Sequence, residues 1–423
     1  MNAVTEVIVV GAGLAGIAAA TRLEKRGVRV IVLEAKDSPG GRAATSEALG
    51  RPVDLGASWL HGTRDHPLHD RARARGLPLV PFDYDSLALY RADGEPEPTA
   101  AGTMDRFEDA LERLGRGAKR HDSVQDRMAR LEGGAGDELP AALRDFLVAT
   151  VLEEEYAADV HELAARALEE GRSMRGGDAI LQGGYAALYR PLCSRLDIRF
   201  RTAVSEIDLG GDGVTVITSA GRFTADQLIL TVPLGVLKGD ALRIVPPLPA
   251  PQRRAIDALG MGLCNKLYLK FPRVFWDEEV QTVGYQHPER GRWLSWYNYA
   301  RVTGLPVLLG FCTGTAAVSV EALDDDATVA DAMAVLRRIY GPAIPEPEAA
   351  IVTRWGRDPH SLGAYSFLRV GARPSQRDEL ATPVLHRLLI AGEATDRRYP
   401  GTTQGAWRAG RRAAKAVLKL RRP

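Results

Sequence analysis

The sequence is poor in cysteine and has no cysteine pattern that would organise a fold. Its 423 residues include only Cys193, Cys264 and Cys312, which lie far apart and form no Cys-x-x-Cys pair. Disulfide frameworks and structural zinc sites depend on closely spaced cysteines. The sequence therefore predicts neither a disulfide framework nor a bound metal ion.

Long apolar runs and an excess of charge of one sign are also missing. A membrane-crossing helix needs roughly 18 apolar residues, and no run in the sequence is that long. No signal-peptide pattern precedes the first apolar segment. The 54 acidic residues nearly balance the 55 basic ones, so net charge favours neither nucleic acid nor a membrane as a partner. We expect a cytoplasmic protein, either a monomer or a homodimer.

The length indicates more than one hydrophobic core. Hydrophobic residues make up 45% of the chain and charged residues 26%, which is typical of globular proteins. Single cores stop growing at about 250–300 residues, so a chain of this length predicts two domains.

A glycine-rich turn near the start of the chain stands between two apolar runs. Residues 7–10 and 28–33 have the composition of buried strands. Residues 14–26 have the pattern of a helix, and Gly27 is placed to end it. This order of strand, turn, helix and strand predicts an α/β domain with a parallel sheet.

The turn itself reads Gly-x-Gly-x-x-Gly, at Gly11, Gly13 and Gly16. The first glycine permits a tight bend, the second lets the backbone approach a pyrophosphate, and the third lets helix and strand pack closely. Free N–H groups at the helix start attract phosphates. Glu34 follows about 20 residues on and can accept hydrogen bonds from ribose hydroxyls. The segment therefore predicts a dinucleotide site that takes NAD or FAD rather than NADP.

The motif GGRAAT, residues 40–45, favours FAD over NAD. A second glycine pair and an arginine directly after the ribose acid suit the extended path from pyrophosphate to flavin.

At this point the sequence resembles the flavin-containing amine oxidase family, and its motif pattern is most similar to polyamine oxidases. The matching motifs occur in family order over most of the chain: DLGASWLHG (54–62), LQGGYAALYRPL (181–192), RTAVSEI (201–207), GLCNKLYLKFPRVFW (262–276), RWGRDPHSLGAYS (354–366) and LLIAGEATDRRYPGTTQGAWRAGRRAA (388–414).

The resemblance implies an α/β, two-domain FAD-dependent amine oxidase fold. A Rossmann-like FAD-binding domain would comprise residues 1–75, 176–239 and 381–423. An α+β substrate domain would comprise residues 76–175 and 240–380.

The turn and the resemblance together predict the cofactor-binding residues. These are Gly11, Gly13, Gly16, Glu34, Ala35, Gly41, Arg42, Gly56, Ala57, Ser58, Trp59, Val204, Trp355, Gly392, Glu393, Gly401, Thr402 and Thr403. Residues 402 and 403 also suit the start of a helix, whose dipole would stabilise negative charge on the reduced flavin.

Four catalytic residues follow from the resemblance: Lys266, Tyr365, Thr402 and, on the substrate side, His61. The lysine of the family's Asn-Lys pair, here Lys266, would hold a water against flavin N5. Tyr365 would form one wall in front of the flavin, against which an amine can lie. Thr402 stands where monoamine oxidases carry a second tyrosine. Monoamine oxidases bind the flavin through a cysteine before the first tyrosine; Ala364 stands here, so we predict noncovalent FAD.

The resemblance also implies contacts with the substrate. Animal polyamine oxidases have a histidine at the place of His61, facing the channel. Plant polyamine oxidases have an acidic residue in a segment similar to VLEEEYAADVHEL, which here points to Glu154 or Glu155 as substrate-channel residues. Helical spacing predicts that Glu155 shares one face with Asp159 and Glu162.

These features predict an oxidase that converts a C–N bond of a small-molecule amine to an imine, and then to an aldehyde. Dioxygen would be reduced to hydrogen peroxide. Thr402, His61 and the acidic helix favour a di- or polyamine, or an N-substituted relative, as substrate. Three alternatives remain open: an L-amino-acid oxidase, which needs an arginine for the carboxylate; a tailoring oxidase or desaturase of a natural-product amine such as an aminosugar; and a non-catalytic FAD-binding scaffold.

Overall fold

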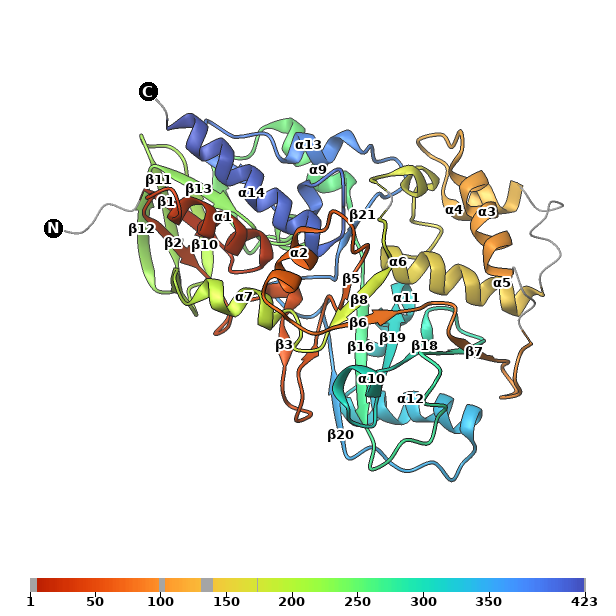
Figure 1. Ribbon diagram of the computed structural model, residues 1–423. Coiled ribbons are helices and arrows are strands. Elements are labelled where there is room, and N and C mark those ends of the chain that lie inside the picture. The colour runs from red at the N-terminus through yellow and green to blue at the C-terminus, as the bar shows by residue number, and fades with distance from the viewer. Residues whose placement is uncertain (1–5, 99–102, 131–139, 173, 422–423) are drawn as a thin grey trace.

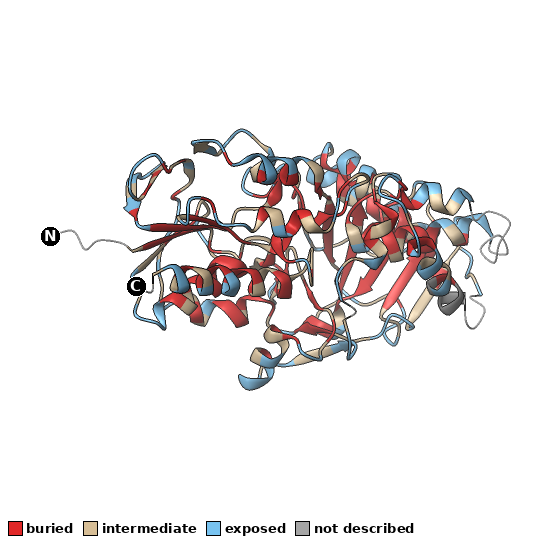
Figure 2. Ribbon diagram, turned by 90° about the horizontal axis from the view of Figure 1, so that it is seen from above, coloured by how far each residue is buried: buried red, intermediate tan, exposed pale blue. Residues whose placement is uncertain are grey.

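The computed structural model describes residues 6–98, 103–130, 140–172 and 174–421. The predicted domain ranges also include residues 1–5, 99–102, 131–139, 173 and 422–423, which lie outside this description. Two halves with separate sheets lie side by side (Figure 1), and buried residues fill the sheets and the inner faces of their helices (Figure 2).

A five-stranded parallel sheet forms the centre of the first half, called here the five-stranded half. Its spatial order is β22 (Leu388–Ile390), β13 (Gln227–Leu230), β1 (Val7–Val10), β2 (Val30–Leu33) and β9 (Asp197–Arg199). All four residues of β1 are buried, as expected for a strand covered on both faces. The parallel arrangement confirms the α/β class predicted from the apolar runs.

Different elements cover the two faces of this sheet. Successive side chains of a strand point to opposite faces, so alternate residues of β1 pack against different elements. Val7 and Val9 pack with α1 (Leu14–Glu24) and α14 (Thr403–Leu420). Ile8 and Val10 pack towards a four-stranded sheet, whose order is β12 (Gly221–Ala225), β11 (Val214–Thr218), β10 (Val204–Asp208) and β14 (Arg243–Val245). The helix α1 begins and ends close to the predicted positions, with Gly27 at a φ of 75° after it.

The second half, called the six-stranded half, is built on a mixed sheet. Its order is β20 (Ala349–Val352), β16 (Cys264–Lys270), β19 (Val307–Thr313), β18 (Arg292–Asn298), β17 (Thr282–Tyr285) and β7 (Leu87–Tyr90). Leu267 and Leu269 of β16 pack with residues of α11 (Gly314–Glu321) and α12 (Asp325–Tyr340). The alternate residues Lys266 and Tyr268 therefore face the other side of the sheet, towards the five-stranded half.

One long helical stretch beside this sheet changes its winding. It runs from α5 (Ala141–Leu147) through a π-helical turn (Val148–Glu153) into α6 (Glu154–Tyr156). The stretch ends at Ala157, which has a left-handed backbone with φ of 52°. The expectation that Glu155 shares a helix face with Asp159 and Glu162 is therefore wrong, because the helix stops before both.

The remaining elements lie outside these three sheets and the long helical stretch. The strands are β3 (Thr45–Ser46), β4 (Val53–Asp54), β5 (Trp59–Leu60), β6 (Leu79–Phe82), β8 (Asp178–Leu181), β15 (Gly260–Met261) and β21 (Ser366–Phe367). The helices are α2 (Pro67–Ala74), α3 (Thr103–Gly115), α4 (Val124–Arg130), α7 (Ala186–Cys193), α8 (Leu234–Lys238), α9 (Ala250–Ala258), α10 (Ala300–Thr303) and α13 (Ser375–Leu380), with 3-10 turns at Gly41–Ala43, Ala165–Glu169 and Glu393–Thr395.

Some strand pairs cross the domain boundaries expected from the sequence. Residues 243–245 form β14 and pair with β10 of the five-stranded half. Residues 79–82 form β6 and pair with β8. In the described part of the chain, no helix has both the length and the apolar character needed to cross a bilayer.

Candidate active site

A cavity of about 680 Å³ extends from the glycine-rich turn of the five-stranded half to β16 of the six-stranded half. Of the residues predicted to form the site, all but one line it. The lining members are Gly11, Gly13, Glu34, Ala35, Gly41, Arg42, Gly56, Ala57, Ser58, Trp59, His61, Glu154, Glu155, Val204, Lys266, Trp355, Tyr365, Gly392, Glu393, Gly401, Thr402 and Thr403.

The exception, Gly16, acts through packing. A Cβ atom at this position would lie 1.9 Å from the carbonyl oxygen of Gly11, so any side chain would push helix α1 away from the turn. Gly11 itself has a φ of 99°, which favours glycine. The role predicted for the third glycine, close packing, agrees with this geometry.

The start of α1 offers free backbone donors to the cavity. Gly13 is the N-cap residue, and no side chain caps the helix. The first N–H groups of the helix therefore remain available to an anion. The carboxylate of Glu34, buried at the end of β2, accepts hydrogen bonds from the backbone N–H groups of Ala12 at 2.6 Å and Lys36 at 2.9 Å.

A buried charge network lies below the middle of the cavity. Glu393 accepts a hydrogen bond from Arg42 at 2.8 Å, from the Ser366 hydroxyl at 2.5 Å and from the Gly401 N–H at 3.1 Å. Burial opposes ionisation of Glu393, but the Arg42 guanidinium and these donors hold the pKa of the carboxyl below its ordinary value. The carboxylate of Glu393 therefore stays ionised although it is buried.

The network continues to residues that the sequence analysis missed. The Arg377 guanidinium donates to the Ser366 hydroxyl at 2.8 Å and binds both carboxylate oxygens of Glu170, at 2.9 and 3.1 Å. Arg377 and Glu170 both line the cavity, although the arginine is fully buried. No local pattern marks either residue, because they are 207 positions apart in the chain.

Lys266 is buried at the far end of the cavity, with 5% of its surface exposed. Its Nζ donates to the Ser58 hydroxyl at 2.5 Å and to the main-chain carbonyl of Asp54 at 3.2 Å. The amine also lies 5.5 Å from the ring centres of Trp59 and Phe311. Burial lowers the pKa of Lys266 to about 8, against the opposing charge of the Asp54 carboxyl.

Aromatic rings surround this end of the cavity. Trp59 contacts Tyr297, Phe82 and Phe311 edge-on, at centroid distances of 5.0, 5.5 and 5.7 Å. Phe311 lies opposite Lys266 across the pairing of β16 and β19. Tyr365 also lines the cavity, and its hydroxyl donates to the main-chain carbonyl of Glu154. We call these rings (Trp59, Phe82, Tyr297, Phe311 and Tyr365) the aromatic chamber.

Two carboxyl groups from the end of the long helix face the chamber. The side chain of Glu154 is largely buried and accepts a hydrogen bond from the Tyr297 hydroxyl at 3.0 Å. Burial raises the pKa of Glu154 to about 7, so its charge changes near neutral pH. Glu155 is accessible from the cavity, and burial of the site raises the pKa of its carboxyl as well.

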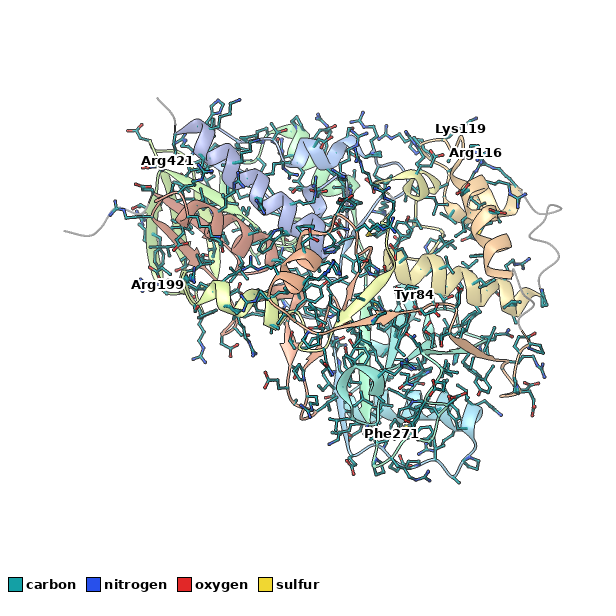
Figure 3. All side chains as sticks on the ribbon, in the orientation of Figure 1. Tyr84, Arg116, Lys119, Arg199, Phe271 and Arg421 are labelled. Carbon is teal, nitrogen blue, oxygen red and sulfur yellow. The ribbon has the colours of Figure 1, made fainter. Side chains whose placement is uncertain are left out.

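His61 lies in a cluster at the outer side of the chamber. Its Nδ1 is 2.7 Å from an oxygen of Asp178, which also accepts a hydrogen bond from the Tyr84 hydroxyl at 2.9 Å. Burial disfavours the charged imidazole, but the hydrogen bond to Asp178 and the charge of Glu155 outweigh it and raise the pKa of His61. In Figure 3 Tyr84 lies just below the long helical stretch that ends in α6. The sequence analysis missed Asp178 and Tyr84.

The helix α14 begins at the cavity, as expected from its two threonines. Thr402 is the N-cap, and its hydroxyl accepts a hydrogen bond from the Gly405 N–H at 3.0 Å.

Among the described cysteines, Cys264 lines the cavity. Burial raises the pKa of its thiol to about 12. The thiol therefore stays protonated at neutral pH and is a weak nucleophile.

The comparisons with known proteins agree on one family. The model of the family described as flavin containing amine oxidoreductase matches residues 14–418. The curated relative lysine-specific histone demethylase 1 homolog 2 of Oryza sativa subsp. japonica is 37% identical, over 97% of this chain and 57% of its own length. Polyamine oxidase 2 of Arabidopsis thaliana is 35% identical, over 96% of this chain and 87% of its own length. The chain spans a little over half the length of the demethylase-type relatives.

Solved structures match in fold. Wild-type putrescine oxidase bound to putrescine superposes with a TM-score of 0.81 at 22% identity, over 99% of both chains. A double mutant of putrescine oxidase gives a TM-score of 0.82 at 21% identity. The expected two-domain amine oxidase fold is confirmed.

The residues present fit the flavin that this family contains. A Cβ atom at Gly11 would lie 2.7 Å from the Thr231 hydroxyl, and the uncapped start of α1 is suited to a pyrophosphate. The dinucleotide turn identifies the flavin as FAD. The cavity continues from this turn to the aromatic chamber.

Proposed function

We propose, because the chain belongs to the family of flavin-containing amine oxidoreductases, that it oxidises a di- or polyamine or an N-substituted relative. One observation carries this proposal: Glu154 and Glu155 face an aromatic chamber at the Lys266 end of a cavity that begins at a dinucleotide turn. Carboxylates and aromatic faces both attract a cationic, elongated amine.

FAD, when bound, supplies the two-electron acceptor for the carbon next to the amine nitrogen. The chain would hold the dinucleotide at the start of α1, at Glu34 and through the Arg42–Glu393 pair. The cofactor would be noncovalent, because Ala364 precedes Tyr365 and the buried Cys264 thiol stays protonated.

Within the chamber the protein binds and orients the amine. Tyr365 provides a wall that its hydrogen bond to the Glu154 carbonyl fixes in place. An ammonium ion cannot release a hydride from its neighbouring carbon, so the amine must first lose a proton. Glu154, whose pKa lies near 7, and His61, hydrogen-bonded to Asp178, are placed to accept protons near neutral pH.

The overall chemistry balances as follows in this proposal. The amine gives up two electrons and two protons to become an imine. Water then hydrolyses the imine to an aldehyde, and the nitrogen leaves as ammonia from a primary amine or as a shorter amine from a secondary one. Dioxygen takes up the two electrons and two protons and becomes hydrogen peroxide. Lys266 lies at the end of the cavity where positive charge would assist electron transfer to oxygen.

The charges in the cavity argue against an L-amino-acid substrate. Among the described residues, the arginines that line the cavity are Arg42 and Arg377. Each already binds a carboxylate, Glu393 or Glu170. A substrate carboxylate entering the chamber would therefore meet acidic residues and no free guanidinium.

A second candidate substrate is the N-methylated lysine of a peptide. Its support is the 37% identity to lysine-specific histone demethylase 1 homologues. A methylated ammonium suits an aromatic chamber as well as a polyamine does. A natural-product amine remains a third candidate, and a non-catalytic scaffold a fourth.

Anaerobic flavin reduction by candidate substrates tests the proposal. The purified protein is mixed with spermine, spermidine, putrescine, N-acetylated polyamines, a dimethyl-lysine peptide, an aminosugar and several L-amino acids. Rapid bleaching of the flavin absorbance by a polyamine is the expected result. Bleaching by the peptide alone would favour the second candidate. Bleaching by amino acids alone, or by none of the compounds, would contradict the proposal.

A further inference from the structure

The motif DLGASW at residues 54–59 surrounds the Lys266 amine from one side. Nζ donates to the main-chain carbonyl of Asp54 and to the Ser58 hydroxyl, and the Tyr268 hydroxyl donates to the same carbonyl at 2.8 Å. Residues 54–59 therefore fix the position of the amine. The Asp54 side chain has no part in these contacts, so its carboxyl needs a separate explanation.

The Asp54 carboxyl is buried among neutral donors. Asp54 has 1% of its surface exposed. One carboxyl oxygen accepts hydrogen bonds from the Thr45 hydroxyl at 2.6 Å and from the Tyr185 N–H at 3.0 Å. Among the described residues, no cation lies within ion-pair distance of this carboxyl, and the positive group that acts on it is Lys266. An isolated buried carboxylate is costly in free energy. The ionised form of Asp54 is therefore stabilised by the Lys266 ammonium, and the reverse also holds.

The other groups around Lys266 carry no charge at neutral pH. They are the rings of Trp59 and Phe311, the Cys264 thiol and the phenols of Tyr268 and Tyr299. Burial raises the pKa of Asp54 to about 7 and lowers that of Lys266 to about 8, while each group opposes the shift of the other. In this dry environment a carboxylate has a strong effect on a nearby ammonium.

We propose that Asp54 is a positioning residue whose carboxylate keeps the Lys266 amine protonated at the end of the cavity. Through Lys266 it sets the positive charge available where reduced flavin meets oxygen; this consequence rests on the proposed function, whereas the coupling itself does not. The pair shares protons between two buried groups, so replacing either residue changes the titration of the other.

The variant Asp54→Asn tests the coupling with little change in shape. The amide oxygen of asparagine can still accept from the Thr45 hydroxyl and the Tyr185 N–H. Flavin is reduced with dithionite, so no amine substrate is needed, and reoxidation by air is followed by stopped flow over pH 6–10. The midpoint of the rate profile should move down by about one pH unit, the lower end of the roughly 1–3 units by which a nearby opposite charge shifts a pKa.

A second readout does not involve oxygen. Consider pH values between the pKa of Lys266 in the folded protein and its pKa in the unfolded chain. In this window the unfolded chain binds more protons than the folded protein, so the free energy of unfolding rises with pH. Without the Asp54 carboxylate the pKa of Lys266 in the folded protein is lower. The rise in the free energy of unfolding should therefore begin at lower pH in Asp54→Asn than in the wild type. The exposed Asp212, replaced by asparagine, is the matched control for loss of one negative charge; its curves should overlay those of the wild type.

Comparison in a Lys266→Met background separates coupling from a structural effect. There the Asp54→Asn shift of the reoxidation midpoint should disappear, and so should the earlier onset of the rise in the free energy of unfolding, because both depend on Lys266. The change below about pH 7, which comes from the titration of the Asp54 carboxyl itself, should remain. A shift of equal size in both backgrounds, or no shift in either readout, would overturn the proposal. If Asp54→Asn does not fold, Thr45→Val replaces it, because loss of one donor weakens the carboxylate and should give a smaller shift in the same direction. Failure of every amine to reduce the flavin would contradict the proposed function and leave the unfolding result intact.

Discussion

The guanidinium of Arg377 binds both carboxylate oxygens of Glu170, and neither side chain is more than 3% exposed. The pair joins α13 to the segment that follows the 3-10 turn at Ala165–Glu169. Through Ser366 it also supports Glu393 and Arg42 beside the cavity. One buried ionic network thus connects α13 and the segment around Glu170 with the residues beside the dinucleotide turn.

Arg377→Met should destabilise the protein strongly. The substitution leaves the Glu170 carboxylate buried without a partner, which costs about 3–5 kcal/mol. Denaturant unfolding measures the change. The matched control is Arg199→Ala, which removes an exposed partner of Asp197 and should cost less than about 1 kcal/mol. Equal losses in the two variants would contradict the importance of the buried pair.

Glu154→Gln should weaken turnover of cationic amines. Glutamine can still accept from the Tyr297 hydroxyl, but the charge is lost, and a charge-assisted contact worth about 1.5–3 kcal/mol corresponds to a loss of roughly 10- to 150-fold in kcat/KM. Steady-state kinetics with the best amine measures it. Glu162→Gln is the control, because Glu162 lies beyond the end of the helix and does not line the cavity. Unchanged kcat/KM in Glu154→Gln would remove Glu154 from substrate binding.

The same variant should change how stability depends on pH. Between about 4.5 and 7 the unfolded chain has Glu154 ionised while the folded protein keeps it protonated. The folded state then binds more protons, so the free energy of unfolding falls as pH rises through this window. Glu154→Gln should match the wild type below about pH 4 and exceed it above pH 7 by at most about 3 kcal/mol. Parallel stability curves across pH 4–8 would contradict the raised pKa.

Gly16→Ala should disrupt the dinucleotide turn. The added Cβ would meet the Gly11 carbonyl at 1.9 Å, so the helix start must move, at a cost of about 1–3 kcal/mol or more. We expect a lower flavin content after purification, measured as the ratio of flavin to protein absorbance. Gly211→Ala is the control, because open space surrounds that glycine. Full flavin content in Gly16→Ala would show that the turn tolerates the shift.

Acid precipitation should release all flavin from the protein. Ala364 occupies the position before Tyr365, and burial raises the pKa of the Cys264 thiol to about 12, so this cavity-lining cysteine is not ready to bond the cofactor. The absorbance of supernatant and pellet gives the distribution. Yellow colour that stays in the washed pellet would demonstrate a covalent bond and contradict the prediction.

Sequence patterns located the elements whose signals are local. The order of strand, glycine turn and helix follows from hydrogen-bond spacing and side-chain size within a few residues, and α1, Gly27 and the Thr402 cap lie where the sequence predicts them. Lys266, which the resemblance places at the flavin, lies in the strand β16 and is buried. The helical spacing of Glu155, Asp159 and Glu162 misled, because spacing alone does not reveal a left-handed residue at 157.

The sequence by itself therefore determined the dinucleotide turn, the family and a set of site residues of which all but Gly16 line the cavity. Only the tertiary structure decided how their charges are set. Lys266 obtains its partners from a segment more than 200 residues earlier, and Asp178 meets His61 and Tyr84 across long loops. Such contacts leave no periodic trace in the chain, because the partners are brought together by sheet packing. Burial then shifts each pKa by an amount that depends on the surrounding atoms and not on the neighbouring residues in sequence.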